Sequence, residues 1–284
     1  MIRRRMLLNS GASNKYLTLS PIGLLGYSIN VSFSNNCEYN NGDGWQELGA
    51  GETIKTDKTI RFRGNLTPTS TNGIGTFTIS GSNVKLSGNC MSMLFGDDAD
   101  KHDSLVGYDY AFNNLFKGCK NLVEVDKDVL PATTLSEYCY SYMFYNCTKL
   151  TNVPDLPAMN LAGRCYSYMF YNCTSLQVVD KTLLPALELK TQCYHNMFRS
   201  CTNLMVAPEL PALNLASNCY YMLFNKCSKL DYIKAMFLTT PSNTYTNGWV
   251  DGVAASGTFV KNKNATWNVV GINGVPEGWT VKTE

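Results

Sequence analysis

The eleven cysteines are the residues of this chain best able to do chemistry, as nucleophiles, metal ligands or disulfides. Histidine, the usual partner of a cysteine nucleophile and a common zinc ligand, occurs only twice. No C-x-x-C spacing occurs, so the sequence does not predict a zinc site. Cys193 and His195 suggest a dyad, but residues two apart on a helix point in different directions. We therefore predict no catalytic residue, no metal ligand and no cofactor.

Ten of the cysteines recur at regular positions, and the stretch CYSYMFYNCT occurs twice, at residues 139 to 148 and 165 to 174. One set of cysteines lies before a recurring phenylalanine and the other set after it. The residues of this ladder are Phe116, Phe144, Phe170, Phe198 and Phe224, followed by Cys119, Cys147, Cys173, Cys201 and Cys227. We expect buried free thiols that act as small apolar side chains, with disulfides between neighbouring turns as the alternative.

The spacing within one repeat predicts a helix followed by a short strand. Four apolar residues stand four apart, which places them on one face of a helix: Leu161, Cys165, Met169 and Cys173. After the last cysteine of a repeat comes Leu-x-x-Val, an apolar run ended by proline that suits one brief strand. A unit of this size buries too little apolar surface to fold alone, so the repeats must stack into a solenoid.

These repeats resemble the BspA-like, or Treponema-type, leucine-rich repeat, whose unit reads I-x-x-x-A-F-x-x-C-x-x-L-x-x-I. The residues in those places are Cys165, Met169, Phe170, Cys173, Leu176 and Val179. The match recurs over residues 111 to 238, with Cys in place of Ile and Met in place of Ala, which leaves the core apolar. The resemblance implies a curved scaffold for binding, as in adhesins and surface proteins, and it does not imply catalysis.

The remaining segments complete the expected organisation. Residues 1 to 26 are expected to form an N-terminal arm, and the alternating residues of YSINVSF, TIRFRG and TFTISGSNVKLSG predict a small β-sandwich-like domain over 27 to 88. The leucine-rich-repeat solenoid is expected over 89 to 238, with a capping turn at 89 to 110 and five repeats at 111 to 238. Residues 239 to 284 are expected to cap it. The predicted class is α+β: an antiparallel β domain, a solenoid with one helix and one short strand per turn, and a C-terminal β cap.

Rows of tyrosines are expected on the exposed face of the predicted helices. They form the candidate binding surface: Tyr140, Tyr142, Tyr145, Tyr166, Tyr168, Tyr171, Tyr194 and Tyr220. Tyrosine offers a large contact area at low entropic cost, so such rows could stack on sugars or anchor a protein. The alternative is that the tyrosines only stack on one another between turns.

Charge and hydropathy exclude several classes of partner. The formal net charge is only +2 and charged residues make up 16%, which does not favour nucleic acid or an anionic membrane. The acidic stretch GDDADKHD does not have EF-hand spacing, so a solvated loop is favoured over a calcium site. The apolar stretch at Met6 to Leu8 is too short for a secretory signal, and no stretch is long enough to span a membrane. We expect a protein made in a cytoplasm that leaves by another route, if at all.

The β domain, the repeats and the GWTV ending together resemble surface or phage-encoded proteins of gut Bacteroidales. The resemblance implies a non-enzymatic structural or binding protein. The first hypothesis is a bacteriophage virion component, such as a tail fibre, another tail appendage or a head-decorating protein, and the alternative is a bacterial cell-surface adhesin. Expected partners are other virion or surface proteins and a host-surface protein or glycan. Fibre-like appendages are often homo-oligomers.

Overall fold

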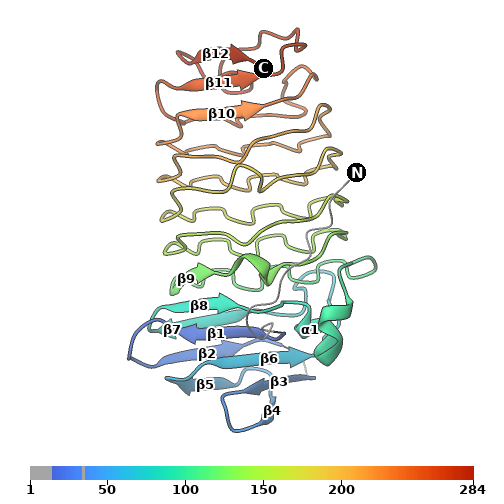
Figure 1. Cartoon of the computed structure of the whole chain (residues 1–284), viewed down its shortest axis with the longest axis vertical. Coiled ribbons are helices and arrows are strands. Elements are labelled where there is room, and N and C mark those ends of the chain that lie inside the picture. The colour runs from blue at the N-terminus through green and yellow to red at the C-terminus, as the bar shows by residue number, and fades with distance from the viewer. Residues whose placement is uncertain (1–14, 34–35) are drawn as a thin grey trace.

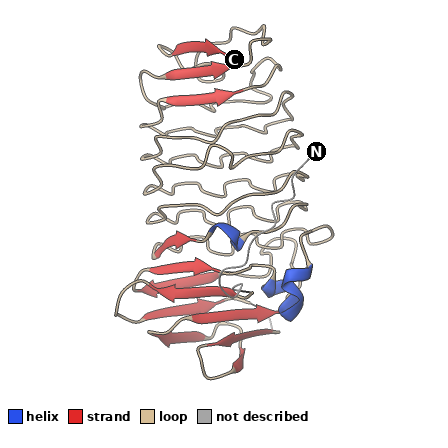
Figure 2. Cartoon of the chain, viewed as in Figure 1, coloured by secondary structure: helices blue, strands red, loops and turns tan. Residues whose placement is uncertain are grey.

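The computed structural model describes residues 15 to 33 and 36 to 284. The chain forms an elongated stack, with a β-rich region at one end and the C-terminus at the other (Figure 1). Most of the stack between them consists of coils without regular helices or strands (Figure 2).

Eight strands form the N-terminal region and contribute to two sheets. They are β1 (Leu17–Pro21), β2 (Tyr27–Val31), β3 (Cys37–Asn40), β4 (Trp45–Leu48), β5 (Thr53–Thr56), β6 (Ile60–Gly64), β7 (Phe77–Gly81) and β8 (Val84–Ser87). One sheet has the order β4-β3-β6-β1-β8-β9, where β9 (Leu122–Val125) comes from the first repeat, and the other has the order β5-β2-β7. Only the β8–β9 pair is parallel. The β region therefore continues directly into the repeats.

The N-terminal strands follow the alternation of their sequences. Along β2, Tyr27, Ile29 and Val31 are buried and the residues between them are partly exposed. Strand β1 lies between β6 and β8, and its two leucines are fully buried. The predicted arm over 1 to 26 therefore contains a central strand. Residues 1 to 14 of that arm, with its three arginines, lie outside the described residues.

A short helix, α1 (Ser92–Phe95), and a 3-10 helix, η1 (Gly96–Lys101), connect the β region to the repeats. The Ser92 hydroxyl donates to the carbonyl of Phe62 at 3.0 Å and accepts the N–H of Leu17 at 2.9 Å. These bonds tie α1 to β6 and to the start of β1. In the part of the chain that the structure describes, α1 is the only α-helix, and the repeats add one 3-10 helix, η2 (Lys127–Val129).

Each repeat contains a run of overlapping β-turns where the sequence predicts a helix. Between 136 and 147, every second N–H donates to the carbonyl three residues earlier, over distances of 3.0 to 3.4 Å. The other N–H groups donate to the next repeat, as Tyr140 does to Cys165 at 2.9 Å. Every fourth residue has a positive φ, at 55° for Tyr138, 57° for Tyr142 and 61° for Asn146. We call this stretch and its equivalents at 108 to 119, 162 to 173, 190 to 201 and 216 to 227 the turn segments.

The predicted α+β solenoid with one helix per turn is therefore wrong. Four residues of an α-helix rotate by about 400°, so side chains spaced by four drift around its axis by about 40° per step. Overlapping turns repeat every four residues without drift, which keeps Leu161 and Cys173 on one side. The left-handed positions favour Asn and Gly, and every turn segment has Asn in at least one of them: Asn114, Asn146, Asn172, Asn196 and Asn218. The predicted strand is also incomplete, because the middle repeats are joined there only by isolated bridges such as Val178 to Val206.

Phenylalanine and cysteine ladders fill the interior of the stack. The ladder phenylalanines are buried and stack between repeats at 5.5 to 6.0 Å, and Phe77 of β7 extends them by a further ring at 4.9 Å from Phe116. The thiol of Cys173 donates to the carbonyl of Phe144 at 3.2 Å, and Cys147, Cys201 and Cys227 make the same bond to the previous repeat. All eleven cysteines are buried and free of disulfides. The cysteine S–H groups of this column therefore add a hydrogen bond between neighbouring repeats.

The C-terminal residues extend the stack with a parallel sheet. Strands β10 (Tyr232–Ala235), β11 (Thr258–Lys261) and β12 (Thr280–Thr283) pair in that order. Three tryptophans lie between them, and each indole N–H donates to a backbone carbonyl, as Trp249 does to Gly274 at 3.0 Å. All four residues of β12 are exposed, so segment 239 to 284 adds further coils to the stack and ends in an open edge.

Candidate functional site

Four of the eight candidate tyrosines lie inside the stack. Each follows the first cysteine of its repeat and is at most 1% exposed: Tyr140, Tyr166, Tyr194 and Tyr220. Their rings stack between repeats at 5.8 to 6.1 Å. The expectation that these four are exposed is wrong because it assumed helical geometry. In the turn segments the residue after the inward cysteine also points inward.

The other four candidate tyrosines lie on the outside and are partly exposed. Tyr142 stacks on Tyr168 at 4.5 Å, and Tyr145 stacks on Tyr171 at 4.7 Å. The two pairs lie side by side, 5.6 to 5.9 Å apart within each repeat. Two further rings continue the first row. The ring centre of His195 lies 5.2 Å from that of Tyr168 and 4.5 Å from that of Tyr221. We call these residues the outer aromatic surface: Tyr142, Tyr145, Tyr168, Tyr171, His195 and Tyr221.

Stacking determines what the outer aromatic surface can offer a ligand. The paired rings cover one another, so a ligand meets ring edges and hydroxyl groups rather than the broad faces that sugars stack on. Burial, aided by the neighbouring tyrosines, raises the pKa of Tyr142 to about 12, and burial also raises the pKa of Tyr168. Both hydroxyls therefore remain protonated at neutral pH. The surface is a row of neutral hydrogen-bonding groups set in apolar rings.

Two cations border these rings, and a third lies over the ring of Tyr138. Lys117 Nζ lies 5.3 Å from the ring centre of Tyr142 and 5.4 Å from that of Tyr145. The Arg199 guanidinium lies 5.7 Å from the ring of Tyr171, and that of Arg164 lies 5.1 Å from the ring of Tyr138. No carboxylate of residues 15 to 33 or 36 to 284 is within 4.0 Å of any of the three cations.

These cations were not among the predicted site residues, although the sequence contains a pattern that indicates two of them. Lys117 and Arg199 directly follow the ladder phenylalanines of their repeats, as Tyr145 and Tyr171 do in the two repeats between. Aligning that column shows a cation at each end of a tyrosine pair. Only the tyrosines of this column were compared, and the column was not extended to the residues at the same position in the flanking repeats.

Cys193 and His195 do not form a nucleophile and base pair. The Cys193 thiol is inside the stack, and burial raises its pKa well above the ordinary value. His195 is on the outer surface, where burial, together with Arg164 and Arg199, lowers its pKa to about 4. At neutral pH the thiol is therefore protonated, and the neutral imidazole contacts tyrosine rings on the other side of the backbone.

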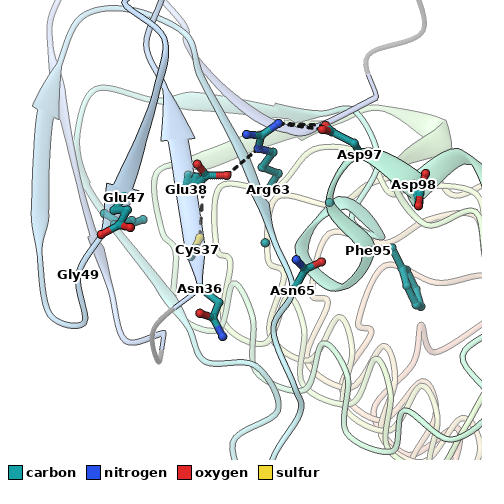
Figure 3. Close-up of a pocket in the computed structure, with 13 residues that line it drawn as sticks. Asn36, Cys37, Glu38, Glu47, Gly49, Arg63, Asn65, Phe95, Asp97 and Asp98 are labelled. Atoms are coloured by element: carbon teal, nitrogen blue, oxygen red, sulfur yellow. Dashed lines mark hydrogen bonds and ion pairs between the residues drawn. The ribbon is translucent and has the colours of Figure 1, made fainter.

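A second candidate site is a polar pocket of about 970 Å³ in the β region, lined by residues of β3, β4, β6, α1 and η1 (Figure 3). Arg63 donates from Nε to Glu38 at 2.7 Å and from a terminal nitrogen to Asp97 at 3.0 Å. Its guanidinium also lies 4.2 Å from the ring centre of Trp45. Arg63 thus links three elements around the pocket. Cys37 lines the pocket too, but burial raises the pKa of its thiol to about 12, so it is a poor nucleophile.

The acidic stretch of residues 96 to 103 does not gather its carboxylates around one point. Asp97 accepts hydrogen bonds from Arg63 and from the hydroxyl of Tyr16, whereas Asp98 pairs with Lys101 at 2.6 Å. Among the described residues, no group of three or more His, Cys, Asp or Glu side chains could hold a metal ion. The carboxylates of Asp97 and Asp98 therefore serve local ion pairs.

No protein-family model matches the sequence, and neither a curated protein nor a solved structure has significant similarity to it. No helix within residues 15 to 33 and 36 to 284 has the length and apolar character needed to cross a membrane.

Proposed function

We propose that this chain is a non-enzymatic recognition scaffold whose outer aromatic surface binds another macromolecule. The observation that carries the proposal is the alignment of tyrosine rows and unpaired cations on one side of a stack held by interior ladders. Tyrosine and arginine are enriched where binding energy concentrates in protein interfaces. A rigid stack also holds these side chains in place before binding, which lowers the entropic cost of association.

A bacteriophage virion is the first proposed setting, and a bacterial cell surface is the alternative. Both settings use an elongated protein that presents a recognition surface away from its point of attachment. The long stack with a distinct β region at one end supports this arrangement (Figure 1). The partners would be other virion or surface proteins at one end and a host-surface protein or glycan along the stack.

Peptide mass spectrometry distinguishes the two settings. Peptides of this chain should be found in gradient-purified phage particles from the source culture. Recovery only from outer-membrane fractions would exclude the virion and support the adhesin.

Binding of the labelled chain to host cells, followed by flow cytometry, tests the surface. Changing Tyr145 and Tyr171 together to Phe keeps the stacked rings but removes the hydroxyls that a ligand reaches. We expect a loss of about tenfold in binding, because two hydrogen bonds of about 0.5–1.5 kcal/mol each disappear. Tyr232→Phe, on the exposed side of β10, is the matched control and should leave binding unchanged. Equal binding by all variants would refute the assignment of the surface.

A further inference from the structure

We infer that the ligand of the outer aromatic surface is an extended acidic protein segment that runs along the stack and places carboxylates four residues apart on Lys117 and Arg199. This inference rests on the proposed function and names the chemistry of the partner. It follows from the order of side chains in one column, from their unbalanced charge and from the spacing of the repeats.

The column that directly follows the ladder phenylalanines has a cation at each end. It runs Lys117, Tyr145, Tyr171 and Arg199 through four successive repeats. The ammonium lies 5.4 Å from the ring of Tyr145, the two rings are 4.7 Å apart, and the guanidinium lies 5.7 Å from the ring of Tyr171. A ligand lying along this column therefore meets positive charge, two hydroxyl groups and positive charge again.

The charge at both ends is not balanced by the chain itself. Lys117 and Arg199 have no ion pair among the described residues, and His195 beside Arg199 adds no charge at neutral pH. Arg199 donates from a terminal nitrogen to Asn196 at 3.2 Å, while its Nε is buried without a hydrogen-bond partner. A guanidinium that is partly desolvated and only partly hydrogen-bonded gains most from a carboxylate ligand.

Arg164 does not belong to this column. Its guanidinium lies 5.1 Å from the ring centre of Tyr138, and its Nε donates to the side-chain oxygen of Gln192. Lys117 and Arg199 remain as the two ends of the site.

The repeat spacing sets the length of the ligand. Neighbouring chains in a hydrogen-bonded stack are about 4.8 Å apart, so three steps from Lys117 to Arg199 cover about 14 Å. An extended peptide advances about 3.4 Å per residue and turns alternate side chains to the same side. Residues i and i+4 are then about 14 Å apart on one side, with residue i+2 over the hydroxyls of Tyr145 and Tyr171. Because the faces of the paired tyrosine rings cover one another, a sugar has no open ring face to stack on, and the surface suits such a peptide better.

The test uses two fluorescent peptides of identical composition in a threonine background. One has glutamate at every fourth position and the other has the same glutamates in a single cluster. Fluorescence anisotropy at low ionic strength should show about fivefold tighter binding of the spaced peptide. Arg199→Gln and Lys117→Gln should each weaken its binding by about tenfold to a hundredfold, as expected for loss of a charge-assisted hydrogen bond. Lys282→Gln, on the exposed strand β12, is the control for general charge and should have no effect.

Several outcomes would overturn the inference. Equal binding of the two peptides would exclude the four-residue spacing, and unchanged binding by Arg199→Gln would exclude the column. Displacement of the spaced peptide by polygalacturonate at a lower carboxylate concentration would identify an acidic glycan instead. If cell binding depends on the hydroxyls of Tyr145 and Tyr171 but neither peptide binds, the recognition surface stands and its acidic ligand is wrong.

Discussion

Replacing a residue at a left-handed position by glycine or by alanine distinguishes overlapping turns from a helix. The two backbones predict opposite signs for the difference in the free energy of unfolding between the two variants. Ser200 has a φ of 63° and is partly exposed. Replacing it by Ala or by Gly removes the same hydroxyl, so the comparison of the two variants isolates the backbone. We expect Ser200→Gly to be more stable than Ser200→Ala.

The magnitude follows from the conformational preferences of the two residues. A left-handed conformation costs an L-residue about 1–2 kcal/mol because its Cβ clashes with the backbone, and glycine has no Cβ. The greater freedom of glycine in the unfolded chain offsets about 0.5–1 kcal/mol of this. The glycine variant should therefore exceed the alanine variant by about 0.5–1 kcal/mol. In a helix the sign would be reversed, with alanine ahead by about 1 kcal/mol.

Urea unfolding of the full chain measures the difference, and thermal unfolding should show a shift of about 2–3 °C. Ser175, whose φ is not positive, provides the matched control. There Ser175→Gly should be less stable than Ser175→Ala by about 0.5–1 kcal/mol, because only the entropic cost remains.

An alanine advantage at Ser200 as large as that at Ser175 would contradict a left-handed backbone at this position. It would show that the backbone at Ser200 is helical or otherwise right-handed. A strong minimum near 222 nm in the circular dichroism spectrum would support the same conclusion, because overlapping β-turns lack the i to i−4 bonds of a helix.

Three further predictions test the interior and the outer surface. Tyr166→Phe should raise the free energy of unfolding by about 1 kcal/mol, because the buried Tyr166 hydroxyl has no hydrogen-bond partner; Tyr27→Phe, which loses bonds to Leu19 and Lys58, should lower it by about 1 kcal/mol. All eleven buried thiols should react with a thiol reagent only after unfolding. Because burial raises thiol pKa values in the folded chain, the free energy of unfolding should be highest below about pH 8 and should fall as the pH rises above about 9. The ring protons of His195 should titrate near pH 4 by NMR, and because this pKa is lowered, His195 should contribute stability above pH 6.5 that is lost as the pH falls towards 4; a midpoint above 6 would contradict its desolvation.

The repeated residues of the sequence were sufficient to locate the interior ladders, and the alternation of apolar and polar residues was sufficient to locate several strands. The aligned phenylalanines and cysteines are buried, and the alternation in TFTISGSNVKLSG corresponds to β7 and β8. Their pairing was not predictable, since β7 joins β2 in one sheet while β8 joins β1 and β9 in the other. Alternation determines which side chains are buried but contains no information about the neighbouring strand.

The period of the structure and the phenylalanine and cysteine ladders that face its interior were evident from the sequence alone. The sequence did not determine the backbone that carries them. Inward residues spaced by four are compatible with one face of a short helix and almost equally with a run of overlapping turns. The two backbones differ in the acceptors of the N–H groups that are not bonded within a turn. In the structure these groups reach the next repeat, so the turns gain hydrogen bonds that exist only in the stack. The same choice turned Tyr140 inward and brought Lys117 and Arg199 to the ends of one tyrosine column.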